Sequence, residues 1–389
     1  MNRRFGLCVL TLAITCVAVA LAQSDAPVDE RPFVKGGIGD KPFVTRAGRT
    51  SLGGYTEAHF RYERAEGLTE ELTFVPKRIN LFTFTPVSER VRVASEIEFE
   101  EGGEEIIIEL ASVDFDLTDS VSFRAGMLLS PLGRFNLAHD SPANELTDRP
   151  LVATELLGVA LSEPGMGFFG AWYPSPSARL TYELYAVNGF GDGVLVGDEA
   201  GTRIPAGKGT IEDNNTTPSL VGRVAYSPGE KVEIGVSGHH GPYNASAIEG
   251  LEVDESRDVT LFVIDAEARV GRATLRGEYA QAEVDVPTGF MGIFAESQRG
   301  FYAEAVVPFG AGWLASMPES GFAAVARYGR VDFNADVDGD SIGRLTLGAN
   351  FRPQGDTAFK LDYQRTRERD GFNNKADSAA LLFSVASYF

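Results

Sequence analysis

Short runs of alternating apolar and polar residues fill most of this chain. Between positions 91 and 99, Val91, Val93 and Phe99 fall on odd positions, whereas Glu96 and Glu98 fall on even ones. Successive side chains of a β-strand point to opposite faces, so this run predicts a strand with one apolar and one charged face. Similar runs, separated by turn residues, continue to the C-terminus. No helical periodicity of useful length interrupts them, and the chain is therefore predicted to be all-β.

The pattern predicts sixteen strands, an even number. Their expected ranges are 52–64, 72–85, 90–100, 105–116, 121–129, 167–173, 179–187, 219–227, 232–240, 258–270, 273–284, 300–309, 322–333, 343–352, 358–367 and 378–389. Tight turns follow the even-numbered strands and longer connections, such as 130–166 and 189–218, follow odd-numbered ones. The connection 310–321 is an exception, since it is long where a tight turn is expected. This alternation is typical of an antiparallel transmembrane β-barrel with short periplasmic turns and long extracellular loops.

The first 22 residues have the three parts of a secretory signal peptide. Arg3 and Arg4 precede an apolar run, and the run ends at the small-residue site Ala20-Leu21-Ala22. The alternative is a retained membrane anchor, but the run is at the short limit for a spanning helix. We therefore expect cleavage after residue 22, an N-terminal periplasmic segment over 23–50, and the barrel over 51–389.

Composition narrows the classes of partner and chemistry. Both cysteines, Cys8 and Cys16, lie in the expected signal peptide, so the mature chain is predicted to contain no thiol. Without Arg3 and Arg4 the 35 basic residues fall to 33 against 55 acidic residues, a formal charge of −22. Nucleic acid is therefore an unfavourable partner.

A closed barrel of sixteen strands has room for water inside. Closure is required because every backbone amide in hydrocarbon must be paired, and at this strand number an aqueous channel remains. Polar and charged residues on the inward faces then line water, where they are inexpensive. The expected lining residues are Glu57, His59, Arg61, Arg90, Arg92, Glu96, Glu98, Arg124, Arg223 and Arg344.

The third long loop is too long for a bare surface connection. We expect it to fold into the lumen and narrow the pore, because its charges are mixed in sign and suit a transverse field. The residues expected at this constriction are Arg134, His139, Asp140, Glu145, Asp148 and Arg149. The alternative is an extracellular loop whose charges are solvated.

Three stretches resemble the phosphate-selective porin O/P family. They are Arg124-Ala-Gly-Met-Leu-Leu-Ser-Pro-Leu-Gly-Arg-Phe-Asn-Leu137, Asp148-Arg-Pro-Leu-Val152 and Gly165-Met-Gly-Phe-Phe-Gly170. The resemblance implies a sixteen-stranded, homotrimeric porin with the third loop in the lumen. The expected function is passive diffusion of small hydrophilic solutes or ions, with anions such as phosphate as one candidate class, and no cofactor is expected. In anion-specific members, ladders of arginines and lysines guide phosphate. This chain departs from that pattern because carboxylates stand among its arginines.

Three further features of the sequence bear on partners and metal binding. The terminal Phe389 closes an amphipathic strand, as in clients of the outer-membrane assembly machinery, and lipid and lipopolysaccharide are the expected surroundings. No metal site is expected, because His239 and His240 are adjacent on a strand and point to opposite faces. The run 336–340 lacks the ligand pattern of a helical calcium loop and is expected to be a solvated turn, with loose cation binding as the alternative.

No enzymatic activity is expected. The sequence His139-Asp140-Ser141 contains residue types used by hydrolases, but neighbours in sequence rarely form a triad, since the relay needs groups that converge from different elements. The remaining alternative to a porin is a structural or adhesin-type barrel with a plugged lumen. Conductance distinguishes the two.

Overall fold

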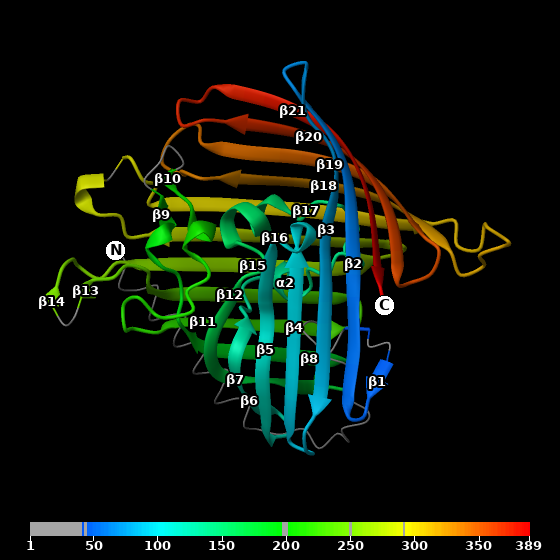
Figure 1. Ribbon diagram of the computed structural model, residues 1–389, viewed down its shortest axis with the longest axis horizontal. Coiled ribbons are helices and arrows are strands. Elements are labelled where there is room, and N and C mark those ends of the chain that lie inside the picture. The colour runs from blue at the N-terminus through cyan, green and yellow to red at the C-terminus, as the bar shows by residue number, and fades with distance from the viewer. Residues whose placement is uncertain (1–40, 43–44, 197–200, 249–250, 291) are drawn as a thin grey trace.

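The chain forms a barrel whose wall consists of sixteen long antiparallel strands (Figure 1). This computed structural model describes residues 41–42, 45–196, 201–248, 251–290 and 292–389, so the expected signal peptide lies outside the described residues. The strands are β2 (Thr50–Ala65), β3 (Leu68–Pro86), β4 (Val91–Glu100), β5 (Glu105–Thr118), β6 (Val121–Leu129), β7 (Ser162–Ser175), β8 (Ala178–Val187), β11 (Ser219–Gly229), β12 (Val232–Pro242), β15 (Asp258–Val270), β16 (Ala273–Val284), β17 (Ser297–Phe309), β18 (Gly321–Asp332), β19 (Ser341–Arg352), β20 (Thr357–Arg369) and β21 (Lys375–Tyr388). The predicted fold class and strand number are confirmed.

The first and last strands of the wall close the barrel. Tyr55 of β2 lies opposite Asn80 of β3 on one side and opposite Tyr388 of β21 on the other. The closure extends to the C-terminus, where Gly54 and Phe389 exchange two backbone hydrogen bonds of 2.9 and 3.0 Å. A closed sheet leaves no open edge, so the backbone groups of the wall are satisfied within it, as hydrocarbon requires.

The two faces of the wall have opposite character. Large apolar side chains such as Phe74 and Leu361 are 82% and 51% exposed, whereas the polar Asn80 and Asp362 are fully buried. Aromatic residues mark the tight-turn end of the outer face, where Phe322 stacks between Phe309 and Phe351 with ring centroids 5.7 and 5.1 Å apart. An outward apolar face with aromatic residues at its border is the surface that a barrel presents to lipid.

The connections also follow the expected alternation. The long ones are 130–161, 188–218, 243–257 and 285–296, and they all lie at the same end of the barrel. The connection 310–320 is long although it lies at the tight-turn end, and the strands on either side of it stand where the sequence predicted them. Boundaries shifted elsewhere: β7 begins five residues before its predicted start.

Short elements occupy the connections and the N-terminal segment. β1 (Thr45–Ala47) pairs with the start of β2, and two small hairpins, β9 (Leu195–Val196) with β10 (Gly201–Thr202) and β13 (Ala247–Ile248) with β14 (Leu251–Glu252), lie in the loops. The helical turns are α2 (Arg134–Leu137), η4 (Val152–Leu157), η3 (Glu101–Gly103), η5 (Asp192–Val194), η6 (Ile204–Gly207) and η7 (Thr288–Phe290). None of the helices in the described part of the chain is long and apolar enough to cross a membrane.

Candidate pore constriction

The connection between β6 and β7, residues 130–161, lies inside the barrel; we call it the inner segment. Its backbone is hydrogen-bonded to side chains from distant parts of the wall. The Gly133 N–H donates to Ser237 of β12 at 2.8 Å, and the Thr147 N–H donates to Asp362 of β20 at 2.7 Å. These strands stand far apart around the wall in Figure 1, so the inner segment crosses the lumen.

One half of the inner segment, residues 150–161, is anchored by apolar contacts; we call it the apolar half. The fully buried side chains of Val152 and Leu156 pack in a cluster with inward residues of β15 and β16, including Leu261 and Ala282. Phe190, from the next long loop, joins the same cluster. This part of the lumen is therefore filled by a packed apolar core. The sequence predicted polar and charged lining residues and did not predict this core.

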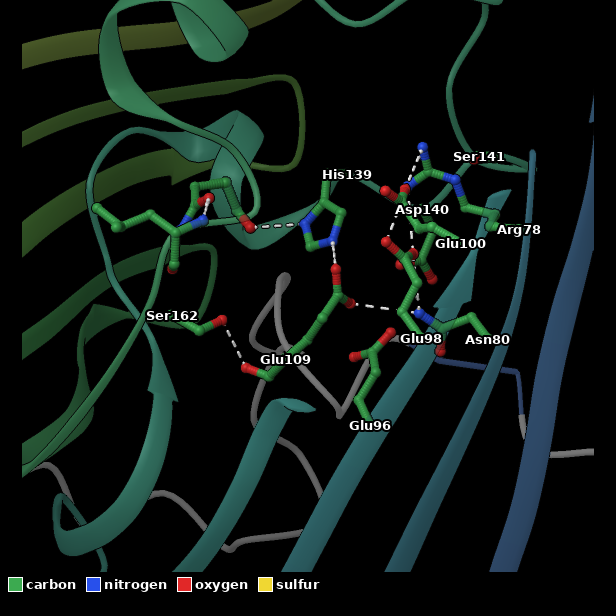
Figure 2. A network of polar contacts seen from close by, with 12 residues as sticks. Arg78, Asn80, Glu96, Glu98, Glu100, Glu109, His139, Asp140, Ser141 and Ser162 are labelled. Atoms are coloured by element: carbon green, nitrogen blue, oxygen red, sulfur yellow. Dashed lines mark hydrogen bonds and ion pairs between the residues drawn. The ribbon is translucent and has the colours of Figure 1, made fainter. Parts of the chain in front are cut away.

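The other half, residues 136–149, is anchored by polar contacts; we call it the polar half. Figure 2 shows His139 between two partners: its Nδ1 lies 2.8 Å from the carbonyl oxygen of Asn136, and its Nε2 lies 3.2 Å from the Glu109 carboxylate. Lys360 is fully buried and donates to the carbonyl oxygens of Ser141 and Leu146 at 2.8 and 3.4 Å. The polar half thus rests on charged side chains of the wall.

Two acidic residues of the polar half pair with arginines of the wall. Asp148 accepts from Arg61 at 2.7 Å and lies 3.6 Å from Arg344. Glu145 lies 3.2 Å from Arg352 and accepts from the Asn350 side chain at 2.6 Å. These pairs place both signs of charge at the contact between the inner segment and the wall.

The two predicted constriction arginines differ in their surroundings. Arg134 pairs with Glu267 of β15 at 2.9 Å, and Glu233 of β12 lies 3.9 Å away. Arg149 forms no ion pair among the described residues, and its Nη2 is buried without a hydrogen-bond partner there. Arg149 is therefore the cation of the inner segment whose charge is least neutralised by contact.

Lys41 joins the polar half from the N-terminal segment. Its ammonium donates to Glu96 of β4 at 2.7 Å and also pairs with Asp140, whose other oxygen accepts from the Tyr388 hydroxyl at 2.9 Å. Phe82 lies beneath the same ammonium, 5.4 Å from it to the ring centroid. A residue expected to belong to a periplasmic segment thus lies inside the barrel and holds the inner segment to the wall.

Arg78 is the centre of the charge network on the N-terminal strands. Its guanidinium lies 3.2 Å from Glu98 and 3.0 Å from Glu100, both labelled in Figure 2, and 3.2 Å from Glu57. Glu57 also lies 2.7 Å from His59. Because its charge is shared among three carboxylates, Arg78 does not act as a free cation on this wall of the lumen.

The remaining predicted lining residues are paired or lie near the rim. Arg124 pairs with Asp114 at 2.7 Å, Arg223 pairs with Asp265 at 2.6 Å, and Arg92 pairs with Asp116. Arg90 stands in the exposed tight turn before β4, which begins at Val91, rather than on an inward face. The arginines of the described lumen therefore do not form an open basic ladder.

A narrow cavity separates the polar half from β2 and β3. Its lining residues are Glu57, Arg78, Ser141, Asn144, Leu146, Thr147, Asp148 and Arg149. Its volume is about 10 Å³, which is room for about one water molecule. This is where the inner segment and the wall come close with polar groups of both signs on either side.

The charge pairs shift the pKa values of two groups of the inner segment. Burial alone would lower the pKa of His139, but the Glu109 carboxylate more than reverses this and raises it above the ordinary value. Burial alone would raise the pKa of Asp148, but Arg61 and Arg344 lower it below the usual range. In both groups the surroundings therefore favour the charged form.

The residue types that suggested other chemistry are separated in space. His139 faces Glu109, Asp140 faces Lys41, and the Ser141 hydroxyl donates to Glu57 at 2.5 Å, so the three do not form a relay. His239 is buried against Glu163, whereas His240 is exposed on the other face of β12. No group of three potential metal ligands occurs in the described part of the chain.

Sequence reasoning missed Arg78, Glu109, Lys41 and Lys360 as site residues. Glu109 occupies a β-bulge, since Glu96 pairs with Leu110 and Ile97 pairs with Ile108, and the bulge turns both Glu109 and Leu110 inward. Strict alternation cannot anticipate that extra residue. Lys360, in contrast, lies on a regular strand, and the alternation of 358–367 was a signal that could have found it.

Comparisons with known proteins agree on the fold. No family model matches the chain. An uncharacterised protein of Aquifex aeolicus is 23% identical over 370 residues, which is 86% of this chain and 79% of the relative. The anion-selective porin from Comamonas acidovorans superposes with a TM-score of 0.57 at 13% identity, over 87% of this chain and 99% of that one. The outer membrane channel DcaP of Acinetobacter baumannii gives a TM-score of 0.57 at 12% identity, over 87% and 97%.

The fold is therefore that of the sixteen-stranded outer-membrane porins. At these identities the likeness concerns the architecture and not the chemistry of the lumen. Barrels of this fold, closed and with an apolar outer band, lie in the bacterial outer membrane, and the chain is placed there accordingly.

Proposed function

We propose that the chain is an outer-membrane porin through which small hydrophilic solutes or ions diffuse passively. One observation carries the proposal: a closed sixteen-stranded barrel holds an inner segment whose polar half faces charged wall residues across a narrow polar cavity. A barrel of this size leaves an aqueous space, and charged groups of both signs along it suit hydrated permeants. The structural neighbours, which are channels rather than enzymes, support the same reading.

We further propose that its selectivity is weak. Most arginines along the lumen pair with carboxylates, as Arg61 does with Asp148, so neither sign of charge dominates at the narrow cavity. Passage of anions such as phosphate then depends on Arg149, which has no contact ion pair among the described residues. The homotrimer that the family resemblance implies belongs to the same proposal, and native mass spectrometry of the detergent-folded protein tests it.

The apolar half supports a second candidate, a structural barrel with a plugged lumen. Val152, Leu156 and Phe190 fill part of the interior with packed apolar side chains, and a packed interior does not conduct. The two candidates differ in whether the space beside the polar half is continuous from end to end.

Planar bilayer recording of the folded chain decides between them. A porin gives stepwise conductance increases, and the reversal potential in a KCl gradient then measures selectivity, with a value near zero expected. Phosphate in place of chloride tests the anion proposal in the same recording. Folded barrels that insert but give no steps would establish the plugged barrel instead.

A further inference from the structure

Exposed arginines gather on the outer face of the barrel at its loop end, on the strands from β17 through β21 to β2. They are Arg64, Arg299, Arg330, Arg365 and Arg367, and we call them the arginine belt. The side chains of Arg299, Arg365 and Arg367 are 56%, 61% and 54% exposed. Five outward cations in one sector are unexpected in a chain with a formal charge of −20.

The strand register spaces the belt regularly. Arg330 and Arg367 both lie opposite Gly343, one on each side of β19, and Arg365 and Arg64 both lie opposite Ala379 of β21. Adjacent strands are about 4.8 Å apart, so each pair of arginines spans roughly 10 Å across a small residue. At both positions the residue between the two arginines is therefore small.

A hydroxyl group also lies beside Gly343. An atom at the Cβ position of Gly343 would lie 3.5 Å from the Tyr328 hydroxyl. Arg330 forms no ion pair in the described part of the chain, whereas Arg367 shares Asp377 with Arg365 at 2.9 and 3.9 Å. Two guanidiniums and a phenol hydroxyl around Gly343 are donors that fit a phosphate group.

The belt lies at the level where a lipid headgroup would stand. Two residues closer to the middle of the strands, Phe301, Tyr328 and Tyr363 are 38%, 46% and 51% exposed on the same face. Aromatic residues mark the membrane interface, so the arginines stand just beyond the acyl chains on the long-loop side, the side of the outer leaflet. Carboxylates stand at the same level: Asp332, Asp336 and Asp338 line a cleft with Arg299 and Arg330, and Asp377 pairs with Arg365 and Arg367.

We propose that the arginine belt binds the phosphorylated headgroup of an outer-leaflet lipid, with the phosphate between Arg330 and Arg367, over Gly343. A headgroup is favoured over free phosphate because the aromatic residues directly below offer a surface for the acyl chains. The inference concerns the outer face only and holds whether or not the lumen conducts.

Native mass spectrometry of the full barrel, folded in detergent, tests the proposal with bis-phosphorylated lipid A as the probe. We expect the R330Q/R367Q variant to bind this lipid roughly tenfold or more weakly than the unchanged chain. The matched control is R272Q, since Arg272 is an exposed arginine in the tight turn at the opposite end; it should bind as the unchanged chain does. Heat-modifiable migration on gels confirms that each variant is folded.

Two further probes separate the sources of phosphate. Lipid A without phosphates should bind weakly, and excess inorganic phosphate should not displace the phosphorylated lipid fully. Equal binding by R330Q/R367Q and the unchanged chain would overturn the proposal, as would equal binding of the dephosphorylated lipid. Full displacement by inorganic phosphate would overturn the choice of a lipid over a free ion.

Discussion

The two halves of the inner segment are held in the lumen by different forces. The apolar half packs Val152 and Leu156 against inward aliphatic side chains of β15 and β16. The polar half is held by charged partners, among them Glu109 for His139 and Arg61 for Asp148. Apolar packing responds little to pH or salt, whereas charge pairs respond to both. We therefore expect the apolar half to hold the inner segment in place and the polar half to determine which ions pass it.

Truncating the apolar anchor should have the largest effect. Leu156→Ala removes a fully buried side chain from the cluster, and such truncations cost about 2–5 kcal/mol. We expect a lower denaturant midpoint for the folded barrel. We also expect a larger and noisier single-channel conductance, because the inner segment is no longer held in one position against the wall. A matched truncation on the lipid face, Leu361→Ala, should leave the conductance unchanged; equal conductance changes in the two variants would refute this role.

Breaking the main charge pair of the polar half should change selectivity more than stability. Asp148→Asn leaves the guanidiniums of Arg61 and Arg344 without their shared carboxylate. We expect the anion-to-cation permeability ratio to rise roughly twofold to fivefold, because the electric field of charged side chains at a constriction acts directly on the ions that pass it. The reversal potential in a KCl gradient measures this. Asp377→Asn, on the outer face, is the control, and a shift of the same size there would argue against a local effect.

Removing the N-terminal contact should have a smaller effect of opposite sign. Lys41→Gln leaves Glu96 and Asp140 without their shared cation, so the lumen becomes more negative. We expect a modest rise in cation preference and more frequent current fluctuations, because Asp140 keeps only the Tyr388 hydroxyl among its present partners. An unchanged reversal potential together with quiet current would mean that Lys41 does not act at the pore.

The smallest effect should come from pH. The pKa of His139 is raised in the folded protein by Glu109. Its stabilising contribution is therefore complete below the unfolded pKa of about 6.5 and is lost as the pH rises through the higher folded value. We expect current noise to increase on the alkaline side of that transition, and His139→Gln to remove the dependence. The same pH dependence in His139→Gln would assign it to another group.

The sequence predicted the wall far better than the site. Alternation in runs such as 91–99 identified all sixteen strands, because a two-residue period is a local property. It missed the apolar interior, since Leu261 and Val263 face inward while Phe262 and Ile264 lie on the opposite face of the same strand. It also could not pair residues such as Thr147 and Asp362, which only the closure of the barrel brings together.

The central claim is that permeants pass the inner segment beside its polar half, and that the contact of the polar half with β2 and β3 borders the narrowest part of their path. Ser141 lines the cavity there and both cysteines of the chain lie in the expected signal peptide, so Ser141→Cys introduces a single thiol into the mature barrel. During bilayer recording, a positively charged thiosulfonate reagent should reduce the conductance of this variant in discrete steps, which a reducing agent reverses, while Gly271→Cys in a tight turn is unaffected. Complete labelling of the thiol at position 141 without any change in conductance would contradict the claim.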